Sequence, residues 1–190
     1  MNIGLRNRFV HSALLVLALS MCICNTGCPP AKNVTLTADS AKTVYATGEP
    51  IDISLTLTNT GTSVVNLSRL LDGNITISSL TRNGAVVPAA SEDIRYEMDL
   101  ATILKDSVVA VNPGQDVSIR LTSYSYDKLG GQVLRTVKYQ PSDRHKALLR
   151  QVNQPGSYNL ALVYKYAGPS SPGVFSSETN VAHIAFTVTP

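Results

Sequence analysis

The residues best suited to chemistry are the three cysteines of the chain, Cys22, Cys24 and Cys28, which lie together near its start. Thiolates at this spacing could hold a metal ion, but structural zinc takes four ligands, and the chain has no fourth cysteine. Unless one of the cysteines is blocked, an odd reactive thiol would remain in an oxidising compartment. We therefore expect no metal site and no cofactor. The role of the three cysteines must follow from the segment in which they lie.

Residues 1–27 have the three parts of a secretory signal peptide. Two arginines lie within the first eight residues, an apolar run covers residues 9–24, and the small or turn-forming residues 25–27 follow. A membrane-spanning helix needs about 20 apolar residues, more than this run provides. No basic flank follows it, as a stop-transfer segment would require. The pattern predicts a signal peptide that is removed.

Cys28 fits a bacterial lipobox, in which a small residue precedes a cysteine that receives diacylglycerol. Gly27 occupies the position before the cysteine, although Asn25 replaces the expected leucine-like residue. Cys22 is an alternative site, but the bulky Met21 precedes it. Ordinary cleavage further upstream is a third possibility and would leave all three cysteines in the mature chain. We predict lipidation at Cys28, which leaves no free thiol.

The mature chain has the composition of an extracytoplasmic β-protein. It keeps 14 of the 16 Lys and Arg, because two lie in the leader, against 13 Asp and Glu, so its net charge is 14 − 13, about +1. This balance lacks the basic stripe that nucleic-acid binding needs, and we expect no nucleic-acid partner. We expect a tether over residues 28–33, one domain over residues 34–190, and a lipid-anchored location in the cell envelope, in the periplasm or at the cell surface.

Alternation with a period of two residues dominates the mature chain and indicates strands with one buried face. The clearest example places Ile51, Ile53, Leu55 and Leu57 on one face of a strand. Turn signals separate these segments, among them Asp72-Gly73, Asn83-Gly84 and Pro113-Gly114. Residues 94–100 also alternate, and residues 101–106 fit either a strand or a short helical turn. The pattern predicts an all-β, antiparallel, immunoglobulin-like β-sandwich after the signal peptide.

Three segments of the chain resemble bacterial immunoglobulin-like modules. They are YATGEPIDISLTLTNTGTSVVNL (45–67), VNPGQDVSIRL (111–121) and PGSYNLALVYKY (155–166). The chain is similar to envelope lipoproteins with one immunoglobulin-like domain and to the BsuPI-type proteinase-inhibitor domain. The resemblance implies the fold and leaves residues 88–107 and 127–154 outside it. No motif here marks the reactive loop of an inhibitor.

Residues 128–151 are the most individual stretch and form our candidate binding surface. Its cations are Lys128, Arg135, Lys138, Arg144, Lys146 and Arg150, against the single acid Asp143. Such a segment could contact anionic lipid headgroups, a polysaccharide or an acidic partner. The simpler interpretation, which we favour, is a hairpin extension whose charges are solvated. Residues 142–152 could form a short helix that begins at Ser142 or Asp143.

These features favour binding over catalysis. No Gly-x-Ser-x-Gly elbow accompanies His145 and His183, the histidines outside the leader. The acidic stretch at 92–99 lacks the spacing of a calcium loop and fits a solvated strand edge better. We predict a binding or scaffolding protein without catalytic activity, held to the membrane by its lipid, with an envelope protein or a glycan as partner. The alternatives are a proteinase-inhibitor-like module and a carbohydrate-binding sandwich, in which Tyr124 and Tyr126 could stack on sugars.

Overall fold

The computed structural model of the chain describes residues 33–142 and 144–190. The predicted signal peptide, the proposed lipidation site at Cys28 and most of the tether lie outside the described residues. Within the described part no helix is long and apolar enough to cross a membrane.

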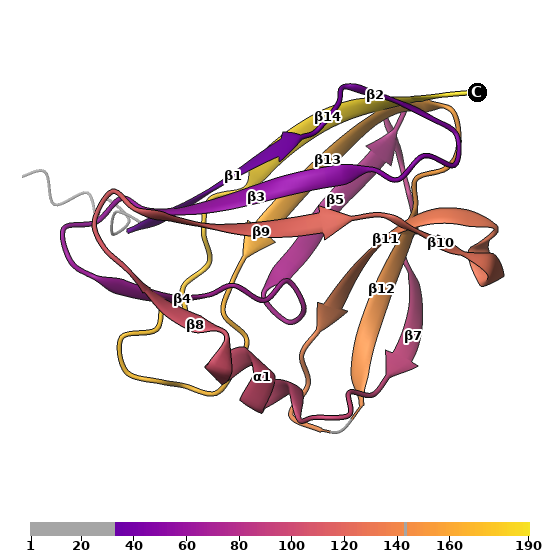
Figure 1. The fold of residues 1–190 in the computed structure, drawn as a ribbon. Coiled ribbons are helices and arrows are strands. Elements are labelled where there is room, and N and C mark those ends of the chain that lie inside the picture. Colours follow the sequence, from indigo (N-terminus) through magenta and orange to yellow (C-terminus); the bar gives the residue numbers. More distant parts are fainter. Residues whose placement is uncertain (1–32, 143) are drawn as a thin grey trace, which may run out of the picture. The chain divides into compact units, whose positions relative to one another are not determined.

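One layer of the fold is a three-stranded antiparallel sheet, which we call the front sheet (Figure 1). In spatial order its strands are β1 (Val34–Ser40), β3 (Asp52–Asn59) and β9 (Asp116–Thr122). The predicted alternation is confirmed in β3, where Ile53, Leu55 and Leu57 are fully buried. The polar residues between these positions lie on the outer face, because successive side chains of a strand point to opposite sides.

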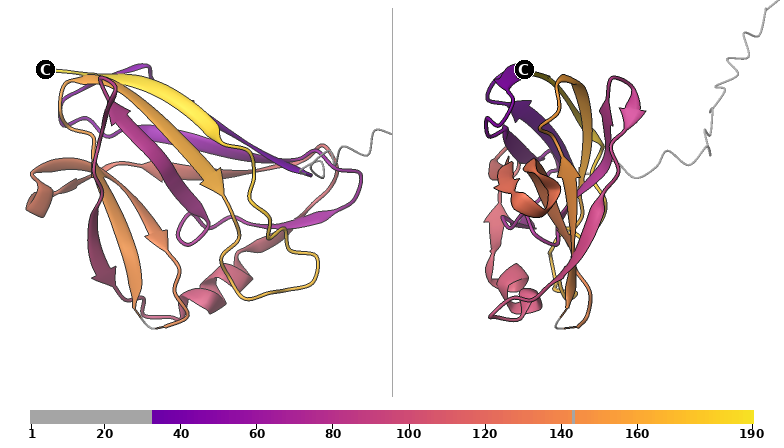
Figure 2. Two further views of the ribbon diagram at one scale, coloured as in Figure 1. Left: turned by 180° about the vertical axis from the view of Figure 1, so that it is seen from behind. Right: turned by 90° about the vertical axis from the view of Figure 1, so that its right-hand side faces the viewer.

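The facing layer, the back sheet, has five strands (Figures 1 and 2). In order they are β2 (Val44–Ala46), β14 (Ala182–Thr189), β13 (Gly156–Tyr164), β5 (Ile75–Arg82) and β6 (Ala85–Val86). All its pairs are antiparallel except β2 with β14. The predicted Asn83-Gly84 turn joins β5 to β6, and both residues have the positive φ of a type I′ turn, 50° and 82°.

The two layers enclose one apolar cluster, which we call the main core. It contains Ile53, Leu55 and Leu57 from β3, and buried side chains of β5, β9, β13 and β14 pack against them. Tyr158 and Phe186 stack in it with ring centroids 5.1 Å apart. The predicted all-β, antiparallel, immunoglobulin-like sandwich is therefore confirmed for the described residues.

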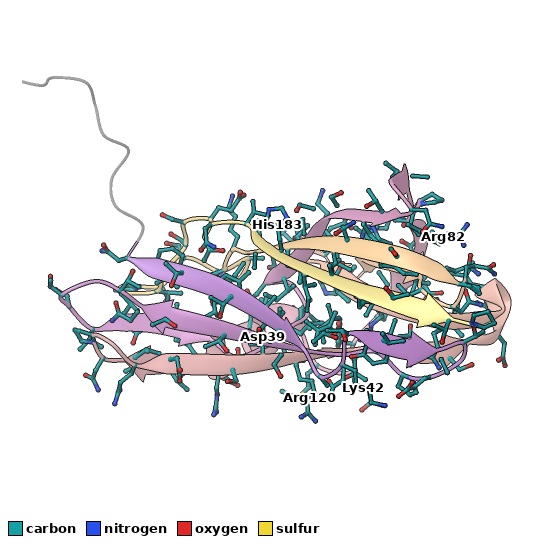
Figure 3. The ribbon with its side chains drawn as sticks, turned by 90° about the horizontal axis from the view of Figure 1, so that it is seen from above. Asp39, Lys42, Arg82, Arg120 and His183 are labelled. Atoms are coloured by element: carbon teal, nitrogen blue, oxygen red, sulfur yellow. The ribbon has the colours of Figure 1, made fainter. Side chains whose placement is uncertain are left out.

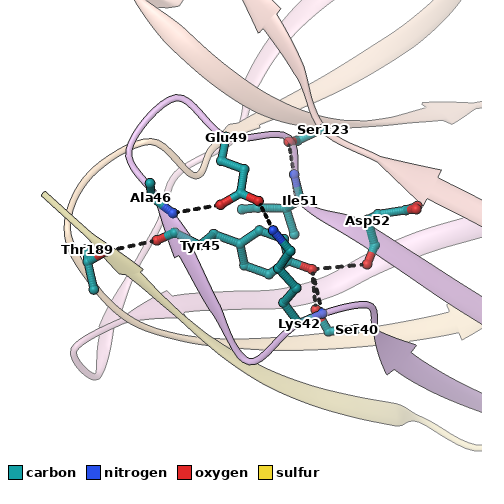
Figure 4. Close-up of polar contacts among 9 residues, drawn as sticks. All are labelled: Ser40, Lys42, Tyr45, Ala46, Glu49, Ile51, Asp52, Ser123 and Thr189. Carbon is teal, nitrogen blue, oxygen red and sulfur yellow. Dashed lines mark hydrogen bonds and ion pairs between the residues drawn. The ribbon is translucent and has the colours of Figure 1, made fainter.

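The turn before β3 is fixed by polar contacts around Tyr45 (Figure 4). The Tyr45 hydroxyl lies 2.7 Å from Ser40 Oγ and donates to the Asp52 carbonyl at 3.3 Å. Glu49 accepts from the Ala46 N–H at 2.9 Å and also bonds the Lys42 ammonium. These bonds satisfy the polar groups of the turn, so β3 enters the front sheet in one register.

A second, smaller assembly lies beside the sandwich (Figure 1). Its four-stranded side sheet has the order β10 (Tyr124–Tyr126), β11 (Gly131–Lys138), β12 (His145–Gln151) and β7 (Ala90–Ile94). The short η1 (Asp127–Leu129) links β10 to β11, and β4 (Val65–Ser68) pairs with β8 (Val108–Val111). Helix α1 (Leu100–Asp106) contributes Leu100 and Leu104 to a side core with Val137, Ala147 and Tyr166.

Two local predictions were wrong, and both errors concern this side assembly. Residues 142–152 do not form a helix, since β12 pairs with β11 and β7 and buries His145, Ala147 and Leu149 on one face. The strand expected over residues 94–100 stops at Ile94. The open alternative at 101–106 is resolved as helix, which Asp99 caps. For β12, the partner β7 lies far away in the sequence, and this tertiary pairing overrides the local helical pattern.

Candidate functional site

A cavity of about 500 Å³ lies where the front sheet meets the side sheet. We call it the seam cavity. It is lined by Leu71, Arg120, Leu121, Thr122, Tyr124 and Arg135. These side chains come from the loop before β5, from β9, from β10 and from β11.

Ser123 creates this junction because it moves the chain from one sheet to the other. It is buried between β9 and β10, and its N–H donates to the Ile51 carbonyl at 2.8 Å, which ends the pairing of β9 with β3. Its hydroxyl accepts from the Ile51 N–H at 2.8 Å and donates to Gln132 Oε1 at 2.9 Å. Gln132 in turn donates to the Gly48 carbonyl at 3.1 Å. Thr122 and Tyr124 are thereby held on either side of a fixed bend.

One wall of the seam cavity rests on a partly buried polar cluster. The Arg135 guanidinium donates to Asp72 Oδ2 at 2.9 Å, and the Tyr96 hydroxyl donates to the same oxygen at 2.5 Å. The Arg135 side chain is 36% exposed and the Asp72 side chain 12%. Burial, together with the bond to Asp72, raises the pKa of Tyr96 well above its ordinary value. The phenol therefore stays protonated and keeps donating.

Asp72 is fixed in turn by its own tight turn. Gly73 has a φ of 83°, and a Cβ atom at this position would lie 3.2 Å from Leu104 Cδ1 of α1. The Gly73 N–H donates to the Val137 carbonyl at 2.9 Å. The turn is thus held between α1 and β11, and only glycine fits its conformation and its space without strain.

The aromatic wall of the cavity is Tyr124. Its ring makes an edge contact with Tyr126 at 6.2 Å between centroids, and the residue is 37% exposed. Partial burial raises the pKa of the Tyr124 phenol. Tyr126 donates its hydroxyl to Glu92 of β7, so this neighbour is itself anchored.

Arg120 and Thr122 form the rim on the front sheet. Arg120 Nε lies 3.4 Å from Asp52 Oδ1, and Thr122 donates its hydroxyl to the same oxygen at 3.0 Å. The Arg120 side chain is 73% exposed and that of Asp52 33%. Figure 3 shows Arg120 projecting from the outer surface, away from the core. An exposed pair of this length contributes little to stability, so the guanidinium can turn to a ligand.

The cavity combines apolar side chains, one half-exposed aromatic ring and two arginines. Such a wall can bind apolar and anionic groups, and it holds no nucleophile next to a base. In the described part of the chain, no group of three His, Cys, Asp or Glu side chains is placed to hold a metal ion. The acids of the 92–99 stretch take separate roles, since Glu92 accepts from Tyr126, Asp93 pairs with Lys146 at 2.5 Å, and Asp99 caps α1.

The six cations of the predicted binding surface do not share one face. Lys138 and Lys146 are cross-strand partners, and Arg150 lies on their side of the sheet, whereas Arg135 points to the opposite face. The others are Lys128, whose ammonium lies 5.9 Å from the Tyr126 ring centroid, and Arg144, which is exposed before β12. Only Arg135 of the six lines the seam cavity.

Sequence reasoning missed Arg120 and Asp72 as site residues. Arg120 is one polar residue of an alternating strand, and nothing local marks it. Asp72 was predicted as a turn residue, which it is, but its side chain is buried against Arg135 and Tyr96, which are distant in sequence. Tyr124 was singled out as a residue that could stack on sugars, and the structure places it in the cavity.

No family model and no curated protein sequence matches this chain. Among solved structures it is similar to the CARDB domain of PF1109 from Pyrococcus furiosus in solution, with a TM-score of 0.34 and 10% identity over 82% of this chain and 94% of that one. A crystal structure of the same domain in complex with di-metal ions has a TM-score of 0.35 and 13% identity, over 82% of this chain and 87% of that one. AvmM, which catalyzes macrocyclization in alchivemycin A biosynthesis, has a TM-score of 0.35 and 12% identity, over 84% of this chain and 90% of that one. At these values the similarity assigns neither ligand nor activity to this chain.

Proposed function

We propose that this chain is a lipid-anchored, extracytoplasmic binding protein without catalytic activity, and that the seam cavity is its ligand site. One observation supports the choice of site above all. The cavity brings the half-exposed ring of Tyr124 together with the guanidinium groups of Arg120 and Arg135 at the joint between two sheets. Concave sites with apolar walls and a few fixed polar groups are typical of ligand binding.

The proposed anchor is a diacylglycerol group on Cys28. Acyl chains bind a bilayer through their buried methylene groups, and two chains give stable attachment where one does not. The domain would then present its loops and cavity from the membrane surface to another envelope component.

The anchor is tested by labelling cells with a clickable fatty acid. Wild type and Cys22→Ala should both incorporate the label, and Cys28→Ala should lose it, because only the lipidated cysteine carries the acyl chains. Equal labelling of wild type and Cys28→Ala would rule out lipidation at Cys28.

The ligand site is tested by affinity purification of the full chain from detergent-solubilised envelopes. The Tyr124→Ala variant should retain at least about tenfold less partner than wild type, since an aromatic side chain at the centre of a site often carries much of the binding energy. Tyr126→Phe is the matched control, because Tyr126 lies on the same strand, does not line the cavity, and keeps its ring contact with Tyr124 in this variant. Equal loss in both variants, or in neither, would argue against the seam cavity.

A carbohydrate ligand is the second candidate, and the exposed ring of Tyr124 is the observation that favours it. Retention of the full chain on cell-wall glycan, lost in Tyr124→Ala, would support it. The proteinase-inhibitor alternative predicts stoichiometric inhibition of a protease, and we regard it as the weaker proposal because no motif marks a reactive loop.

A further inference from the structure

The edge of β9 beside the seam cavity is open for hydrogen bonding. Strand β9 is the last strand of the front sheet and, among residues 33–142 and 144–190, pairs only with β3. The Asn59 N–H donates to the Gln115 carbonyl at 3.0 Å, and the Ser123 N–H donates to the Ile51 carbonyl at 2.8 Å. Hydrogen-bonded positions recur at every second residue of an antiparallel pair. The odd-numbered residues of β9 therefore direct their backbone groups toward β3.

It follows that Ser118, Arg120 and Thr122 direct their N–H and C=O groups to the opposite edge. In the described part of the chain these groups have no backbone or side-chain partner. Arg120 and Thr122 line the seam cavity, so their open groups border a space that can admit another segment.

A similar gap exists on β11. The Val152 N–H donates to the Gln132 carbonyl at 2.9 Å, so the even-numbered residues of β11 face β12. On the other side Val133 is opposite Tyr124, and the Val137 carbonyl accepts from Gly73. Arg135 lies between these two positions, and among the described residues its backbone groups have no partner. Two strands that line the cavity thus present unpaired backbone groups.

We propose that an extended segment of an envelope protein adds to β9 as a further strand, with one apolar side chain in the seam cavity and a carboxylate beside Arg120. This deepens the proposed function, on which it rests for the choice of site. Strand addition supplies affinity through main-chain hydrogen bonds and specificity through alternate side chains. Leu71 and Leu121 provide the apolar surface for the inward side chain.

The expected charge of the partner follows from exposure. In both ion pairs near the cavity the arginine is more exposed than its acid: Arg120 is 73% exposed against 33% for Asp52, and Arg135 36% against 12% for Asp72. An approaching segment therefore meets positive groups before negative ones, which favours an acidic residue at the rim.

A single segment fits this edge better than a second copy of the domain. Helix α1 and strand β8 lie on the same side of the molecule as β9 (Figures 1 and 2). A second copy would bring its own β3 and β1 toward them along with its β9, whereas an extended segment adds one strand only.

The test uses the full chain in detergent micelles and the labelled peptide acetyl-STLEVTS-amide. In antiparallel pairing its glutamate lies opposite Arg120 and its leucine beside Leu121. We expect saturable binding by fluorescence anisotropy, and slower hydrogen–deuterium exchange at Ser118, Arg120 and Thr122, because these amides become bonded. No binding at millimolar peptide would overturn the proposal.

Two controls separate strand addition from simple apolar binding. The same peptide, N-methylated at its glutamate and second threonine, loses donors that would face β9 and should bind at least about tenfold more weakly. The Arg120→Glu variant should bind the original peptide about fivefold or more weakly and should prefer acetyl-STLKVTS-amide. The Lys138→Glu variant should bind both peptides with the affinity of wild type. Equal binding of the N-methylated peptide, or no charge preference, would overturn the proposal.

Other occupants give distinct results. If the β9 amides become protected in the absence of peptide as the protein concentration rises, the occupant is a second copy of the domain. That result would overturn the proposal that a peptide segment occupies this edge. Glycan binding that needs Tyr124, with no peptide binding, would overturn strand addition and leave the proposed ligand site intact. Absence of both peptide binding and glycan binding would refute the seam cavity as the ligand site. Failure of fatty-acid labelling would refute only the proposed lipid anchor.

Discussion

Different kinds of contact stabilise the main core and the side sheet. The main core is a continuous apolar cluster between two sheets, and its members alternate regularly along their strands. The side sheet has a small apolar core of five buried residues, supplemented by polar contacts such as Arg135 to Asp72 and Tyr126 to Glu92. We therefore expect the main core to carry most of the stability, and the proposed ligand site lies at the margin of the less extensively packed side sheet.

The largest expected effect is on the main core. Leu55→Ala removes a fully buried side chain from the centre of β3 and should lower the free energy of unfolding by about 3 to 5 kcal/mol. Urea denaturation followed by circular dichroism measures it. Hydrogen exchange should accelerate in both sheets, and acceleration limited to β3 would contradict a single cooperative core.

The matching change in the side core is Leu104→Ala, also at a fully buried position. We expect a smaller loss in the free energy of unfolding, about 2 to 3 kcal/mol, because the side core has fewer buried side chains than the main core. Hydrogen exchange should accelerate in α1, β11 and β12 while β3 and β13 stay protected. Equal acceleration everywhere would show that the two regions unfold as one unit.

Alkaline pH should weaken the main core through Tyr164. Burial raises the pKa of this phenol from 10.0 to about 12, and its hydroxyl accepts from the Ser68 N–H at 3.0 Å. Above pH 10 the unfolded chain loses this proton and the folded chain keeps it, so stability falls as pH rises. The loss should reach about 2 kcal/mol by pH 12. In Tyr164→Phe the slope between these pH values should be smaller, and an unchanged slope would contradict the assignment.

The polar cluster of the side sheet should give the smallest effect. Asp72→Asn keeps the size of the side chain but removes the charge that Arg135 and Tyr96 share, so we expect a loss of about 1 to 2 kcal/mol. Thermal unfolding at neutral pH measures the loss. Tyr96→Phe in the Asp72→Asn background should then cost less than in wild type, and additive losses would show that the groups do not act together.

The sequence was a better guide to the main core than to the site. Alternation identified the buried face of β3, and the Asn83-Gly84 dipeptide identified a tight hairpin, because both signals are local. Residues 142–152 fit a short helix locally, but they form β12, which makes a hairpin with β11 and pairs on its other edge with β7, a strand distant in sequence. Asp72 gave only a turn signal and Arg120 gave none, because their places at the site depend on partners from other strands and loops. Residues 88–107 and 127–154, for which the sequence offered no immunoglobulin-like motif, contain α1, β7, β11 and β12.

We propose that this protein meets its partner at the seam cavity. A photocrosslinking aromatic amino acid placed at Tyr124 in living cells tests it most directly, with the same residue at His183, which is exposed on β14 (Figure 3), as control. Illumination should give a discrete crosslinked product from position 124, reduced in Arg120→Glu, and none from position 183. Equal crosslinking from both positions, or a product from position 183 alone, would show that the partner does not bind at the seam cavity.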